Sequence, residues 1–115
     1  MDTSFLKEVE QFVNLKTSIQ VKKLNALERA ENKLIFAFDG GMFKADHNTI
    51  NFVKNHHSER DLILMDQNST PILISDQQKF LDKAESCYYE AMNEYHQLYE
   101  ELKKQRTVKK VMDNE

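Results

Sequence analysis

The chain holds 115 residues, a length typical of a single domain of roughly 100 to 150 residues, which excludes a cofactor domain beside a separate substrate domain. Sixteen Lys and Arg against nineteen Asp and Glu give a formal net charge of -3, which excludes a global electrostatic attraction to nucleic acid. The single cysteine, Cys87, excludes an intrachain disulfide and a cysteine-rich zinc site.

The N-terminal segment and the hydropathy pattern predict a cytoplasmic protein. The opening residues MDTSFL lack the basic region and the long apolar run of a signal peptide. No window approaches the roughly 18 apolar residues that a membrane span needs. We therefore expect no membrane association, and the single cysteine fits a reducing compartment.

The first third of the chain contains one clear helix and one ambiguous stretch. Apolar residues recur at helical spacing over residues 4–13, which predicts a short amphipathic helix. Further on, Ile19 and Val21 alternate with polar residues as in a strand, whereas Leu24 and its neighbours keep helical spacing. Of these two interpretations we favour a strand near residues 17–24.

Two β-hairpins are predicted in the middle of the chain. In the first, the apolar runs at residues 34–38 and 42–45 flank Asp39-Gly40-Gly41, and such pairs are preferred at tight turns because both central positions can adopt positive φ. The adjacent glycines, followed by another strand, do not match a phosphate-binding loop. In the second hairpin, strands at residues 62–65 and 71–74 flank a run of turn formers.

A helix is predicted after each hairpin. Asp46 caps the first through Asn55, and Ser75 with Gln78 forms a capping box at the start of a long C-terminal helix. These patterns predict the α+β class: a small antiparallel sheet of about four strands from two ββα units, with a short N-terminal and a long C-terminal helix. We expect one domain over residues 1–106, with the long helix from residue 76, and a tail of mixed charge over residues 107–115.

The long helix carries an apolar seam, here called the heptad seam, at the a and d positions of about three heptads. Its residues are Leu81, Ala84, Tyr88, Ala91, Tyr95, Leu98 and Leu102. At 1.5 Å per residue the helix reaches about 45 Å, which exceeds the width of a four-stranded sheet. The seam therefore either covers the domain's own sheet or forms a coiled-coil contact with a second copy or a partner helix.

Cations follow the heptad seam. They are Lys103, Lys104, Arg106, Lys109 and Lys110. Cations near the C-terminal end of a helix complement its dipole. The functional alternatives are contact with nucleic-acid phosphates or docking onto an acidic partner, and the net negative charge of the chain disfavours nucleic acid.

No catalytic, cofactor-binding or metal-binding site is predicted. His56 and His57 are adjacent and point in different directions on any regular element. Cys87 lies on an apolar helix face, which is typical of a packed thiol rather than a nucleophile. The segment Asp66-x-Asn68-x-Thr70 resembles half of a calcium loop, but Pro71 stands where that loop needs glycine. We expect no enzymatic activity, no cofactor and no small-molecule substrate.

Three segments in residues 60–111 occur in a distinctive order. They are Leu64-Met65-Asp66-x-Asn68-x-x-Pro71-Ile72, Tyr89-Glu90-Ala91-x-Asn93-x-Tyr95 and Leu102-Lys103-Lys104-x-Arg106-x-Val108. This order resembles small uncharacterised proteins of tailed myophages related to the T-even group. The resemblance implies a phage accessory or virion-assembly protein in the host cytoplasm or the virion, and it carries over no catalytic or binding residue.

Together these features predict a non-catalytic interaction or assembly protein that associates through its long C-terminal helix, as a homo-oligomer or with a partner helix. The alternative is an accessory protein of replication or transcription that contacts nucleic acid through the basic C-terminal segment.

Overall fold

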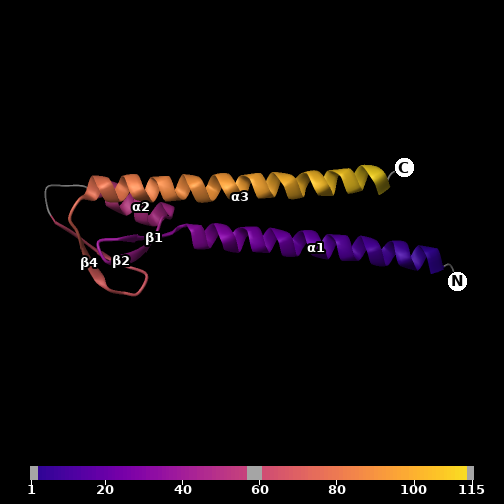
Figure 1. Cartoon of the computed structure of the whole chain (residues 1–115), viewed down its shortest axis with the longest axis horizontal. Coiled ribbons are helices and arrows are strands. Elements are labelled where there is room, and N and C mark those ends of the chain that lie inside the picture. Colours follow the sequence, from indigo (N-terminus) through magenta and orange to yellow (C-terminus); the bar gives the residue numbers. More distant parts are fainter. Residues whose placement is uncertain (1–2, 57–60, 114–115) are drawn as a thin grey trace. The chain divides into compact units, whose positions relative to one another are not determined.

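The computed structural model describes residues 3–56 and 61–113, with side chains described over residues 4–56 and 61–105. Figure 1 shows the elements, which confirm the α+β class with two hairpins. In chain order they are α1 (Thr3–Lys33), β1 (Ile35–Phe38), β2 (Gly41–Lys44), α2 (His47–Asn55), β3 (Leu62–Met65), β4 (Pro71–Ile74) and α3 (Gln77–Asp113).

The described residues group into two compact units. The hairpin unit is Ala30–Glu94, and the helical unit combines the described parts of Met1–Arg29 and Tyr95–Glu115. The helix α3 is helical through Asp113, so the expected tail boundary at residue 106 falls inside it.

The helix α1 corrects two predictions, because one helix of 31 residues replaces the short helix and the strand near residues 17–24. No Gly or Pro occurs before Gly40, so nothing in this segment breaks a helix. Ile19 is half-buried while Val21 is exposed, a pattern that helical rotation produces as readily as strand alternation. The segment is rich in good helix formers such as Ala26 and Ala30. Both alanines are also buried, so packing favours the helix as well.

The hairpin unit contains both predicted hairpins in antiparallel register. Phe36 pairs with Phe43 in one, and Ile63 with Leu73 in the other. The expected single sheet of about four strands is wrong, because the strands form two sheets of two. The outer edge of β2 forms hydrogen bonds with the turn of the second hairpin and not with another strand. The Met42 carbonyl accepts from Gln67 N at 2.7 Å, and the Met42 N–H donates to the Asp66 carboxylate at 3.1 Å.

The Asp39-Gly40-Gly41 segment is a hairpin turn, as predicted. Asp39 and Gly40 both have positive φ, 48° and 83°, which are the conformations a tight two-residue turn requires. Gly41 is required for a steric reason, because a Cβ at this position would lie 2.8 Å from Cγ1 of Ile72. The second glycine therefore permits close packing between the two hairpins.

Phe80, at the start of α3, is the centre of the hairpin unit's core. Its ring is fully buried and lies 5.1 to 5.3 Å from the ring centroids of Phe36, Phe38 and Phe43. Two of these contacts are edge-to-face, an arrangement that adds attraction beyond the burial of apolar area. Both strands of the first hairpin are thus joined to α3 through one side chain.

Two turn aspartates hold the hairpins to each other. The Asp66 carboxylate accepts hydrogen bonds from the N–H groups of Asn68 and Thr70 in its own turn, both at 2.9 Å, besides the bond from Met42. In the other direction, the Asp39 carboxylate accepts from the backbone N–H and the hydroxyl of Ser75, at 3.2 and 3.1 Å. The segment that resembles half of a calcium loop is therefore a turn closed by its own backbone.

The helix caps are partly as predicted. Asp46 caps α2 by accepting from Thr49 N at 2.8 Å, which confirms that prediction. The cap of α3 is Asp76, which accepts from Lys79 N at 3.0 Å, so the capping box on Ser75 and Gln78 is wrong by one residue. Ser75 is engaged with Asp39 instead.

Replacing Phe80 with alanine should lower the free energy of unfolding by about 3–5 kcal/mol, because it leaves a cavity among three phenylalanines. Tyr89→Ala on the same helix is the control, since Tyr89 is 63% exposed and should cost less than about 1 kcal/mol. Denaturant unfolding followed by circular dichroism measures both. Equal losses in the two variants would contradict the central role of Phe80.

The Asp66 carboxylate should make stability depend on acid pH. The backbone N–H groups of Thr70, Met42 and Asn68 hold its pKa below the usual 3.8, so this contribution is complete above that value and disappears as the pH falls through the lowered pKa. Asp66→Asn should therefore unfold at lower denaturant concentration than the parent at pH 7, with the difference shrinking towards pH 2. Asp61→Asn, at an exposed position, is the control, and a pH-independent difference for Asp66→Asn would oppose this assignment.

Candidate interaction surface

The first half of the heptad seam lies inside the hairpin unit's own core. Leu81, Ala84 and Ala91 are 5%, 0% and 0% exposed. Tyr88 is half-buried against this core, and its hydroxyl lies 3.1 Å from Nε2 of His47. A partner chain would reach these positions only if the unit opened, so here the seam covers its own domain.

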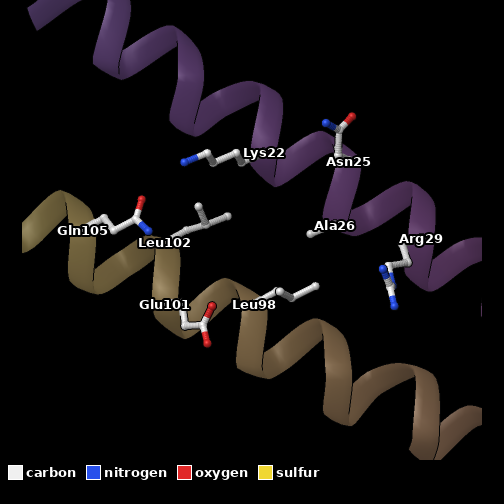
Figure 2. Close-up of a pocket in the computed structure, with 8 residues that line it drawn as sticks. All are labelled: Lys22, Asn25, Ala26, Arg29, Leu98, Glu101, Leu102 and Gln105. Atoms are coloured by element: carbon white, nitrogen blue, oxygen red, sulfur yellow. The ribbon is translucent and has the colours of Figure 1, made fainter.

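The second half of the seam packs against α1 within the helical unit. Leu102 is buried, whereas Tyr95 and Leu98 are half-buried. Figure 2 shows Leu98 and Leu102 pointing towards Ala26 on α1. Lys22 lies near Gln105 and Arg29 near Leu98 (Figure 2), so the two helix segments run antiparallel.

A groove of about 370 Å³ separates the two helices at this point. It is lined by Lys22, Asn25, Ala26, Arg29, Leu98, Glu101, Leu102 and Gln105. The small side chain of Ala26 opposite two leucines leaves the space, and cations and a carboxylate stand on its rim (Figure 2). The groove therefore combines an apolar floor with a rim of mixed charge.

A second apolar face of α1, here called the α1 face, is exposed. Its residues and exposed fractions are Phe5 62%, Leu6 50%, Val9 44%, Phe12 50%, Val13 52%, Leu24 65% and Leu27 43%. At 100° per residue, Val9 and Leu27 lie about a quarter turn round the helix from Ala26, the residue that faces α3. The helix thus has one apolar stripe covered by its own unit and a second one exposed to solvent.

The α1 face was not predicted as a site, although the sequence shows the apolar spacing of its first residues. The apolar spacing over residues 4–13 indicates a short helix with one face buried on the core. The missing information was that the helix continues to Lys33 and that a different stripe, centred on Ala26, packs on α3.

The second hairpin also presents apolar side chains outward. The inward residues of β3 and β4 are buried or half-buried, while Ile63, Met65 and Leu73 are 65%, 65% and 52% exposed. A two-stranded sheet with one solvated face usually alternates apolar and polar residues. This small outward patch belongs to the hairpin unit.

The predicted basic cluster is described only in part. Lys103 and Lys104 are exposed on α3, and the side chains of Arg106, Lys109 and Lys110 lie outside the described residues. Lys23 of α1 lies over the ring of Tyr99, 5.0 Å from its centroid, an example of cation–π contact within the helical unit. Contact of this cluster with nucleic acid stays a prediction.

Reactive and metal-binding groups are few in the described residues. The Cys87 thiol donates to the Lys33 carbonyl at 2.9 Å, and burial together with the Glu90 charge raises its pKa, so the thiol stays protonated and serves packing. Within residues 3–56 and 61–113, no three His, Cys, Asp or Glu side chains are grouped to hold a metal ion. Over the same ranges, no helix combines the length and apolar character needed to cross a membrane.

Comparison with known proteins found no match among family models, curated proteins or solved structures. The function of the chain is therefore inferred from its own residues.

Replacing Leu102 with alanine should loosen the helical unit, because Leu102 is the buried α3 residue opposite Ala26. A large-to-small change of this kind costs about 2–5 kcal/mol. Hydrogen exchange should then accelerate at the amides of residues 15–29 while the core of Ala30–Glu94 keeps its protection. Exposed Lys104→Ala should change neither region. If Leu102→Ala left exchange in residues 15–29 unaltered, the pairing of α1 with α3 would be wrong.

Proposed function

We propose that this chain is a non-catalytic interaction and assembly protein that associates through its long helices. The observation that carries the proposal is the α1 face, whose large apolar side chains form one group from Phe5 to Val13 and a second group of Leu24 and Leu27, all 43% to 65% exposed. Contiguous exposed apolar patches on monomers rarely exceed about 300–600 Å², and larger ones mark interaction sites.

The contact differs from the one expected from the sequence. The heptad seam of α3 is occupied by the chain's own core at Leu81, Ala84 and Ala91. Its role is to hold the domain together and, at Leu102, to support α1. Association is therefore assigned mainly to α1, while Tyr95 and Leu98 of the seam are half-buried.

The setting proposed for this activity comes from the resemblance to small proteins of tailed myophages. It favours a phage accessory or virion-associated factor acting in the host cytoplasm. Accessory and structural roles of this kind need specific protein contacts and no chemistry. The nucleic-acid alternative keeps the exposed Lys103 and Lys104 as its support.

The solution mass of the full chain across a concentration series, at low and at high salt, tests the proposal. We expect a species heavier than the 13.6 kDa monomer, and its stability should change little with salt because apolar burial drives it. A strict monomer at every concentration would contradict assembly by self-association. An oligomer that dissociates steeply with salt would point to charges instead of the α1 face.

A further inference from the structure

We infer that the α1 face binds the α1 face of a second copy of this chain, with the two helices antiparallel. This inference rests on the proposed function and names its partner. Three properties of α1 support it: the area exposed, the distribution of charge along the helix, and the position of the face relative to α3.

The exposed area matches what a dimer needs. The two phenylalanines offer roughly 150–250 Å² each when fully exposed, the five leucines and valines offer less, and all seven residues are about half exposed. They therefore present on the order of 500–600 Å², near the lower end of the roughly 600–1,000 Å² per partner of stable protein–protein interfaces. Leu6 and Leu27 are about 30 Å apart along the helix at 1.5 Å per residue, which is long enough for a helix–helix contact of several turns.

The charges of α1 favour antiparallel pairing of two identical helices. Residues 3–14 carry one cation, Lys7, against the two carboxylates Glu8 and Glu10. Residues 15–29 carry four cations against one carboxylate. Lys22 and Arg29 line the groove on the α3 side and Lys23 lies over Tyr99, so these three act on a second copy through the overall field of the helix and not by direct contact. An antiparallel pair places each acidic half beside the basic half of the other copy, whereas a parallel pair places like charges together. Complementarity of this kind fixes orientation more than it adds affinity.

The register follows from matching the two ends of the face. Placing Val9 opposite Leu24 of the second copy also sets Leu6 opposite Leu27, and the symmetry of the pair makes each contact twice. Lys16 then lies near the twofold axis, where its apolar stem can cover the partner helix while its ammonium reaches water. The quarter turn between this face and Ala26 leaves the contact with α3 intact.

Charge-exchange variants of the full chain test both the partner and the orientation. We expect Val9→Glu and Leu24→Lys each to weaken the dimer by roughly tenfold or more, because each buries an unpaired charge at both symmetry-related contacts. The double variant should regain most of the affinity, since the carboxylate introduced at position 9 of either copy then faces the ammonium introduced at position 24 of the other. Val21→Glu is the matched control: Val21 is 49% exposed against 44% for Val9 and lies about a third of a turn away. Sedimentation equilibrium gives the affinities, and circular dichroism confirms that each variant is folded.

The outcomes separate this inference from the proposed function. If the dimer affinity is unchanged in both single variants, the α1 pairing is overturned but the proposed assembly role remains. A double variant weaker than either single variant overturns the antiparallel orientation. A chain that is monomeric alone and binds anionic vesicles through this face overturns the inference in favour of a lipid surface. A monomer without such binding overturns both the inference and assembly by self-association.

Discussion

The fold depends on one buried ring. Phe80 is the residue at which α3 meets β1 and β2, and its contacts with Phe36, Phe38 and Phe43 fix the hairpin unit's core. Two-stranded hairpins are marginal in water on their own and need a hydrophobic surface to cover them. The first turns of α3 supply that surface, and the bonds of Asp39 and Asp66 then hold the two hairpins in a fixed relation.

The helical unit has a different constraint, because α1 carries more apolar surface than its own unit buries. One stripe, through Ala26, packs on Leu98 and Leu102 (Figure 2). The other stripe includes Phe5, Leu6 and Val9 and is exposed. Ordering an exposed apolar helix of this length costs conformational entropy that burial must offset. The proposed pairing with a second copy of α1 would supply that burial and would connect the stability of the unit to the proposed assembly role.

The sequence predicted the hairpins well because their signals are local. Asp39-Gly40 permits only a few turn geometries, and the apolar runs on either side set the register. The cap of α2 at Asp46 was equally local. These elements needed no information from distant parts of the chain.

The rest could not be predicted because it depends on distant contacts. The stretch around Ile19 and Val21 fits either a strand or a helix, and only the packing of Ala26 on α3 decides between them. The heptad seam predicted either a cover for the domain's own sheet or a contact with a partner helix, and pattern alone does not show which of the two occupies Leu81 and Ala91. The exposed face of α1 emerges only when the covered stripe is known.

The most direct measurement is oxidative cross-linking between copies through one introduced cysteine. Cys87→Ala removes the native thiol, and Lys16→Cys places a thiol near the proposed twofold axis. A disulfide needs Cα atoms about 4.4–6.8 Å apart, so an antiparallel α1 pair predicts rapid cross-linking at position 16. Val9→Cys in the same background should not cross-link, because its two copies would lie about 20 Å apart. Cross-linking at position 9 as fast as at position 16, or at neither, would contradict the account.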